Sequence, residues 1–245
     1  NERMFIPKGD TVTVPGPDGQ PRSHRWDESL FWNVYYVKGA FLDADKAFEV
    51  ISGMRTVELR VLNKCINTLV FARALARHPA FHVCCSAVEG NENHELASRQ
   101  MFLGLPAPLF TVDLETPLGR KVGRRAFQRF FDSLEPAFGL QVTLGQVNTV
   151  VLCPALTSHS ELSDEALREA GISRTTIRVS VGEEDPRSLL AHLMRAAELA
   201  IEPDCPGFVA QFPSPDAIDR LYEESYVDVH RRYARSRPRM TSMLD

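Results

Sequence analysis

A short segment near position 180 constrains the fold more than any other part of the chain. Residues 175–181 alternate, with an isoleucine and two valines on one side and Arg178 on the other, which is the pattern of a β-strand. Four residues after this segment, Asp185 can cap a helix whose first position is Pro186, where proline is tolerated. An apolar stripe then continues to Ile201. A strand followed at once by an amphipathic helix requires a layered fold in which the helix covers a sheet.

Strand and helix patterns alternate upstream of this unit as well. Asp43 or Asp45 can cap a helical stripe that continues to Ala76, and Gly53 in its middle is compatible with two helices or with one kinked helix. The pattern predicts short strands at 81–88, 109–114, 140–144 and 149–152, and helices at 94–102, 125–134 and 163–169. Strands mixed with covering helices predict an α/β or α+β layer packing.

The overall composition excludes several classes of protein. Hydrophobic residues make up 44% of the 245 positions and charged residues 24%, which argues against a disordered chain. The net charge of −4 and the pI of about 6.0 exclude a broadly basic nucleic-acid binder. The apolar runs are too short to cross a bilayer, and no secretory signal is evident. Five cysteines, two of them adjacent, fit a reducing and therefore cytoplasmic setting.

The last 43 residues differ from the rest. Several prolines between Pro203 and Pro215 indicate an extended linker, and residues from 216 to about 232 have a helical pattern. A basic cluster near the end consists of Arg231, Arg232, Arg235, Arg237 and Arg239. Such a cluster either binds an acidic partner or nucleic acid, or is a solvated helix end. Because the whole chain is acidic, we favour the solvated helix end and expect neither a nucleic acid nor a membrane as partner.

Arg178 is the residue that the strand pattern itself offers as a binding group. It shares the polar side of the strand with Thr176 and Ser180. An arginine in this place is either solvated or binds an anion, and its planar guanidinium suits two parallel hydrogen bonds to a carboxylate. No metal, nucleotide or hydrolase motif is present, so we expect no metal site. The residues alone do not choose between the two interpretations of Arg178.

Five segments in order resemble one enzyme family. Residues 53–60, GMRTVELR, resemble its helix G-L-R-T-L-x-L-R, and residues 93–101, NHELASRQM, resemble x-H-x-L-A-x-R-Q-M. Residues 143–148, TLGQVN, are similar to S-L-G-G-V-E, and residues 157–160, TSHS, match M-T-H-A/S. Residues 177–185, IRVSVGEED, closely resemble I-R-L-S-V-G-x-E-D. The chain is therefore identified by resemblance with the Cys/Met-metabolism family of pyridoxal-phosphate (PLP) enzymes.

The resemblance implies a fold and an activity. The fold would be the C-terminal part of an aspartate-aminotransferase-type (fold type I) enzyme, an α/β structure with a small mixed sheet covered by helices and a long linking helix. The cofactor would be PLP. The activity would be a cystathionine γ-synthase-like γ-replacement on an O-acylhomoserine. The alternatives are an O-acylhomoserine sulfhydrylase, a cystathionine or methionine lyase, or a non-catalytic assembly module. Family members are homo-oligomers, dimers of dimers, that act on small amino acids.

The resemblance also assigns site residues. Arg178 would bind the α-carboxylate of the substrate, and Thr143 and Leu144 would lie on the loop beside the cofactor and the substrate. Gln146 and Asn148 depart from the glycine and the glutamate of the family. The Schiff-base lysine of the family lies upstream of the matched segments, so the resemblance assigns no catalytic residue to this chain.

The same comparison predicts three parts of the chain. Residues 1–42 would be the end of the large PLP-binding domain. Residues 43–202 would form the linking helix and the C-terminal α/β domain, and residues 203–245 the proline-rich linker and the basic helical tail, for which the family has no counterpart.

Overall fold

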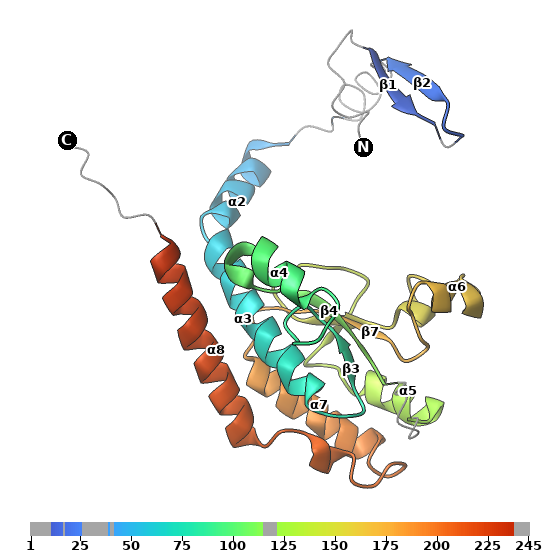
Figure 1. Ribbon diagram of the computed structural model, residues 1–245, viewed down its shortest axis with the longest axis vertical. Coiled ribbons are helices and arrows are strands. Elements are labelled where there is room, and N and C mark those ends of the chain that lie inside the picture. The colour runs from blue at the N-terminus through green and yellow to red at the C-terminus, as the bar shows by residue number, and fades with distance from the viewer. Residues whose placement is uncertain (1–10, 17, 26–38, 40–41, 115–121, 238–245) are drawn as a thin grey trace, which may run out of the picture. The chain divides into compact units, whose positions relative to one another are not determined.

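The computed structural model describes residues 11–16, 18–25, 39, 42–114 and 122–237 (Figure 1). The chain divides into two compact units, residues 1–56 and 57–245. The first unit contains an antiparallel hairpin of β1 (Thr11–Pro15) and β2 (Pro21–Arg25), and the helix α2 (Ala44–Met54). Asp43 caps α2, as predicted, by accepting a 2.8 Å hydrogen bond from the Lys46 backbone N–H.

The second unit is built on a five-stranded sheet with the order β3-β4-β7-β6-β5. The strands are β3 (His82–Cys84), β4 (Leu109–Asp113), β5 (Gly139–Leu140), β6 (Val150–Leu152) and β7 (Ile177–Ser180). All neighbouring pairs are antiparallel except β5 and β6, which are parallel. The predicted small mixed sheet is therefore confirmed. Its central strand is β7, the segment whose alternation was the clearest in the sequence.

Two helices of this unit begin at the capping residues that the sequence predicts. Asp185 caps α7 (Pro186–Ala200), and Ser163 caps α6 (Asp164–Glu169) through a 3.2 Å bond from the Ala166 N–H. The remaining helices are α3 (Val57–Ala76), α4 (His94–Gln100), α5 (Arg124–Asp132) and α8 (Pro215–Ser236). Between the two alternatives that Gly53 left open, the structure has two helices, because α2 ends at Met54 and α3 begins at Val57.

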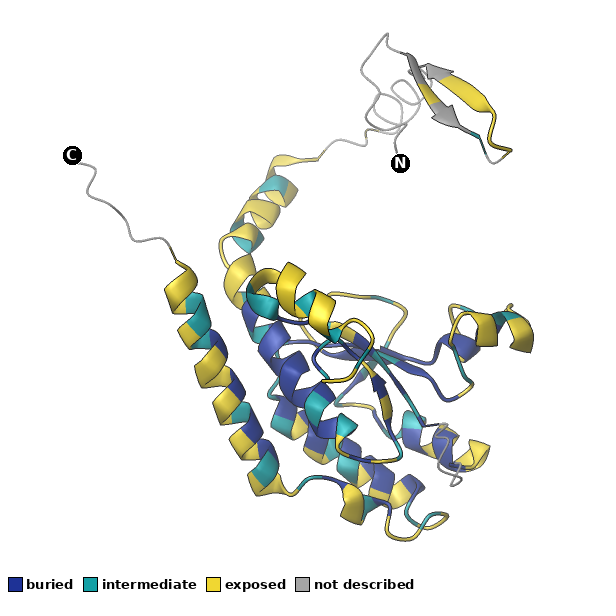
Figure 2. Cartoon of the chain, in the orientation of Figure 1, coloured by how far each residue is buried: buried dark blue, intermediate teal, exposed yellow. Residues whose placement is uncertain are grey.

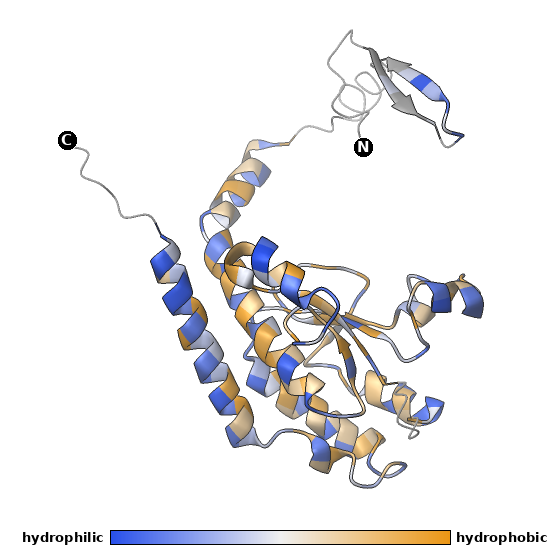
Figure 3. Cartoon of the chain, viewed as in Figure 1, coloured by the Kyte–Doolittle hydropathy of each residue, from blue (hydrophilic) through white to orange (hydrophobic). Residues whose placement is uncertain are grey.

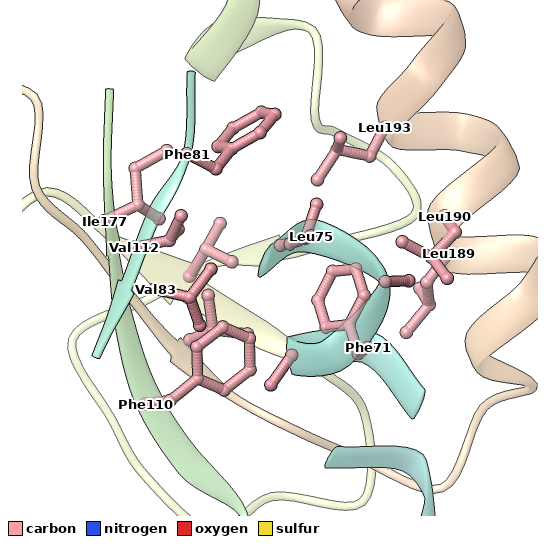
Figure 4. Packing of buried hydrophobic residues seen from close by; sticks show 14 of the residues in the cluster. Phe71, Leu75, Phe81, Val83, Phe110, Val112, Ile177, Leu189, Leu190 and Leu193 are labelled. Carbon is pink, nitrogen blue, oxygen red and sulfur yellow. The ribbon is translucent and has the colours of Figure 1, made fainter. Parts of the chain in front are cut away.

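The core lies between the sheet and the helices α3 and α7. Figure 4 shows Phe71 and Leu75 of α3 between sheet residues such as Val112 and the leucines of α7. Phe71 is 1% exposed and meets the ring of Phe110 edge-on and that of Phe138 in a stacked arrangement. Along α3, burial is nearly continuous from Leu62 onward (Figure 2). These contacts fix α3 against the sheet and make it a rigid support for the segments that follow β7.

The C-terminal segment is attached to this core by His78. The imidazole is fully buried, and its ring lies 4.4 Å from the ring centroids of both Phe208 and Phe212. Nδ1 accepts from the Ala80 N–H, so Nε2 carries the proton and donates to the Phe208 carbonyl oxygen at 2.8 Å. The helix α8 then packs beside α3, with its largely hydrophilic side outward (Figure 3). Its cap is Ser214, two residues before the predicted start.

All the predicted strands are shorter in the structure, and two of them differ most. The segment 81–88 forms a strand only over β3, because a turn closes at Val88, whose N–H donates to the Cys85 carbonyl oxygen. The segment 140–144 is strand only at Leu140, so the prediction for residues 141–144 is wrong. The chain there leaves the sheet and enters a loop, in which the backbone groups of Gly145 and Gln146 bond to the side chains of Ser180 and Lys64. Across the described ranges, no helix is long and apolar enough to span a membrane.

Candidate functional site

Arg178 lies in the centre of the sheet. In β7 it is the cross-strand partner of Thr111 on β4 and of Leu152 on β6. The side chain is partly buried, and its Nε is fully buried with no hydrogen-bond partner. Among the described residues no carboxylate forms an ion pair with this guanidinium. A partly buried cation whose donors are unused is suited to take an anionic ligand, because a buried donor left without an acceptor is costly.

A loop formed by residues 141–148 is fastened beside the same face of β7. The Gly145 N–H donates to the Ser180 Oγ at 3.1 Å. Ser180 and Arg178 are two residues apart on a strand, so their side chains point to the same face. From the other side, the Lys64 Nζ of α3 donates to the carbonyl oxygens of Gly145 at 3.3 Å and Gln146 at 2.6 Å. The loop is therefore held against the face of the sheet that carries Arg178.

A second network fixes the chain directly after β7. The Glu184 carboxylate accepts from the Thr149 N–H at 2.7 Å and from the Thr149 Oγ1 at 2.8 Å. The Thr149 Oγ1 in turn accepts from the Gly182 N–H at 2.9 Å. The buried amide of Asn67 donates to the carbonyl oxygens of Gly182 and Glu184. A Cβ atom at position 182 would overlap the Val147 carbonyl oxygen, so only glycine fits where these two backbone segments meet.

The structure brings the predicted site residues into one neighbourhood. Thr143 is half-buried, and Leu144, which is 50% exposed, directly precedes the anchored Gly145. The substrate-binding roles of Arg178, Thr143 and Leu144 remain predictions, which this placement supports. The polar side of the strand is not a solvated face, because Thr176 and Ser180 are buried.

Sequence reasoning missed Lys64 and Glu184. Both side chains bond to partners that lie far away in the sequence. Lys64 bonds to Gly145 and Gln146, which follow it by 81 and 82 positions, and Glu184 bonds to Thr149, which precedes it by 35 positions. Glu184 lies within the matched 177–185 segment, which offered a signal that it is structurally constrained. Nothing in the sequence distinguished Lys64.

The described side chains offer neither a metal site nor a free lysine for PLP. In the described ranges no cluster of three or more metal-ligating side chains occurs. Lys46 is exposed and paired with Asp43, and Lys64 donates to backbone carbonyls, so both of these described lysines have partners within the chain. Burial raises the pKa of the Cys65 thiol to about 11, which makes it a poor nucleophile. The described site thus offers the unpartnered guanidinium of Arg178 to an anionic group.

Known proteins are similar to this chain in sequence. The sequence profile of the Cys/Met metabolism PLP-dependent enzymes matches residues 20–198. The chain is 30% identical over 169 residues to cystathionine gamma-synthase 1, chloroplastic, of Arabidopsis thaliana, which covers 68% of this chain and 28% of that protein. It is 28% identical over 177 residues to the L-methionine gamma-lyase of Treponema denticola, which covers 72% of this chain and 42% of the lyase.

The structural comparison agrees. A crystal structure of cystathionine gamma synthase from Xanthomonas oryzae pv. oryzae in complex with cystathionine superposes with a TM-score of 0.56 at 27% identity. It covers 73% of this chain and 45% of that one, so the chain spans less than half the length of these relatives. The predicted fold type I architecture is confirmed. By its profile match and its structural likeness, the chain belongs to the Cys/Met metabolism family of PLP-dependent enzymes.

Proposed function

We propose that this chain supplies the substrate-carboxylate subsite of a PLP-dependent enzyme that acts on sulfur amino acids. The observation that carries the proposal is the Arg178 guanidinium, which is set in the central strand with its Nε buried and unpartnered in the described part of the chain. A substrate α-carboxylate would accept two parallel hydrogen bonds from the guanidinium and would satisfy these donors. Thr143 would add a hydroxyl and Leu144 an apolar wall to the same subsite.

The reaction we favour is a cystathionine γ-synthase-like γ-replacement on an O-acylhomoserine. The Cγ–O bond breaks, the acyl group departs as a carboxylate, and the sulfur of a thiol such as cysteine forms the new Cγ–S bond while the thiol proton is released. When bound, PLP withdraws electrons from the substrate and so stabilises the carbanions that such chemistry requires. Arg178 would hold the substrate by its carboxylate and so orient the carbon atoms that react.

The relatives have different activities, and this sets the alternatives. An O-acylhomoserine sulfhydrylase, or a cystathionine or methionine lyase, would use the same carboxylate subsite. A non-catalytic assembly module is favoured by a separate observation, namely that both described lysines are engaged elsewhere. In our proposal the Schiff-base lysine comes from outside the described residues, in a homo-oligomer (a dimer of dimers) located in the cytoplasm. Residues 1–42 would belong to the large PLP-binding domain.

The carboxylate role is tested with Arg178→Ala and Arg178→Lys in the PLP-loaded protein that contains this chain. The substrates are O-acetyl-L-homoserine with L-cysteine, assayed for cystathionine, and L-methionine alone, assayed for elimination. Loss of a bidentate charge-assisted contact costs about 1.5–3 kcal/mol, so Arg178→Ala should lower kcat/KM by roughly ten- to a hundredfold. Lysine, which lacks the planar fork, should restore only part of it.

Arg174→Ala is the matched control, because Arg174 lies shortly before the same strand, is exposed and forms an ion pair with Asp164. It should leave kcat/KM within about twofold. An unchanged kcat/KM in Arg178→Ala would refute the carboxylate role. If borohydride reduction with PLP traps no lysine adduct anywhere in the native protein, the assembly-module alternative is correct and the enzyme proposal is wrong.

A further inference from the structure

Lys64 is buried in a place where lysine is rarely found. Its residue is 6% exposed, whereas the ammonium of a typical lysine reaches solvent. The side chain extends from α3, and its Nζ donates to the carbonyl oxygens of Gly145 at 3.3 Å and Gln146 at 2.6 Å. No carboxylate of the described chain forms an ion pair with it. Burying an ammonium against two neutral carbonyls costs free energy, and a reason to retain such a group is that its contacts specify a conformation.

The conformation that Lys64 specifies is that of Gly145. This glycine has a φ of +79°, a left-handed conformation that side chains disfavour. Its N–H donates to the Ser180 Oγ of β7, and its carbonyl oxygen accepts from Lys64 of α3. The peptide groups on both sides of Gly145 are therefore fixed by two different elements of the core. Residues 144–148 are exposed to solvent, so the two bonds of Gly145 serve as anchors of the loop. A third anchor is the Val147 carbonyl oxygen, which accepts a hydrogen bond from the Glu183 N–H.

The anchored turn sits next to the candidate subsite. Leu144 and Thr143 directly precede Gly145, and Ser180, to which Gly145 bonds, shares a face of β7 with Arg178. The position of the Gly145 turn therefore sets how far Thr143 and Leu144 lie from the guanidinium. A change in the turn would move them relative to the bound carboxylate without touching Arg178 itself.

We infer that Lys64 is a positioning residue that holds the 141–148 loop in the conformation that binds substrate. This inference rests on the proposed function of Arg178. Without Lys64, the loop would occupy its binding conformation for only a fraction of the time, and the apparent affinity would fall by that fraction. If the competent fraction falls to about one tenth, KM for the amino-acid substrate rises about tenfold. The effect on kcat is small, because the loop has its normal geometry whenever it occupies its binding conformation.

The test uses three variants of the full chain. Lys64→Met removes the donors and keeps the length of the side chain, and Lys64→Arg keeps donors that can reach the same carbonyls. Lys46→Met is the matched control, because Lys46 is exposed and, within the described ranges, pairs with Asp43 alone. If Lys64→Met does not fold, Lys64→Gln, which keeps a neutral donor, takes its place. The two readouts are amide hydrogen exchange of peptides covering 141–148 and 57–76, and KM and kcat of the PLP-loaded protein with O-acetyl-L-homoserine.

We expect faster exchange in 141–148 with exchange in 57–76 unchanged, a KM about ten times higher, kcat within about twofold, and partial rescue by Lys64→Arg. Unchanged exchange in 141–148 would overturn the anchoring role. Faster exchange with an unchanged KM, while Arg178→Ala raises KM, would overturn the inference and leave the proposed function standing. If neither Arg178→Ala nor Lys64→Met changes KM, the proposed function has failed, and the substrate role of Lys64 fails with it.

Discussion

Asn67 offers a direct test of how α3 holds the segment after β7. Its Nδ2 donates to the carbonyl oxygens of Gly182 at 3.2 Å and Glu184 at 2.9 Å, and the residue is 2% exposed. Asn67→Leu keeps most of the volume but leaves both acceptors without this donor. A buried acceptor left unsatisfied costs about 1–3 kcal/mol, so the two together should lower the free energy of unfolding by about 2–6 kcal/mol.

Urea denaturation followed by circular dichroism measures this loss. With an m value of about 2–3 kcal/mol per molar, a central loss of about 4 kcal/mol lowers the midpoint by about 1.3–2 M. Asn63→Leu is the matched control on the same helix, because the Asn63 amide makes a single, long 3.5 Å contact with the Glu183 carbonyl oxygen. It should cost less than about 1 kcal/mol. An equal loss in the two variants, or a loss below about 1 kcal/mol in Asn67→Leu, would refute the reasoning.

Three further predictions concern the core and its pH dependence. Phe71→Ala should lower the free energy of unfolding, measured by urea denaturation, by about 3–5 kcal/mol. Phe48→Ala, at an exposed position, should lower it by less than about 0.5 kcal/mol, and equal losses would contradict the packing of Phe71 in the core. Gly182→Ala should cost about 1–3 kcal/mol, because the Val147 backbone cannot give way, and an unchanged unfolding midpoint would mean that it can. Burial lowers the pKa of His78 below its usual 6.5, so below that pH the unfolded chain binds a proton that the folded chain does not. The contribution of His78 to the free energy of unfolding should therefore be complete above pH 6.5 and should fall as the pH drops below it. An NMR titration that gave His78 an ordinary or raised pKa would exclude this cause.

Local chemistry made the helix starts predictable. Asp185, Ser163 and Asp43 cap their helices in the structure because each side chain bonds to a backbone N–H two or three residues away. The identity of β7 was equally visible, since alternation along one strand needs no knowledge of its neighbours. Its place at the centre of the sheet could not be derived from the residue pattern, because it depends on pairing with Thr111 and Leu152, which lie 67 and 26 positions upstream by their numbers.

The candidate site shows the same division. The sequence by itself singled out Arg178, through its place in a strand and the chemistry of its guanidinium, and it indicated the family through five short segments. It also led to the wrong expectation of a strand over residues 141–144: the strand ends at Leu140, and Gly145, the residue that follows this segment, bonds through its backbone to the side chains of Ser180 and Lys64.

Only the tertiary structure decided which groups surround Arg178. Lys64, 81 positions before Gly145, reaches the loop because α3 packs against the sheet, and the hydroxyl of Ser180 finds the Gly145 N–H because the loop folds back onto β7. Helix capping and the alternation of a strand each depend on residues of a single segment, so they can be predicted from the sequence. Bonds between segments depend on how the helices and strands pack as a whole, and that packing is settled by the core rather than by any one stretch of residues.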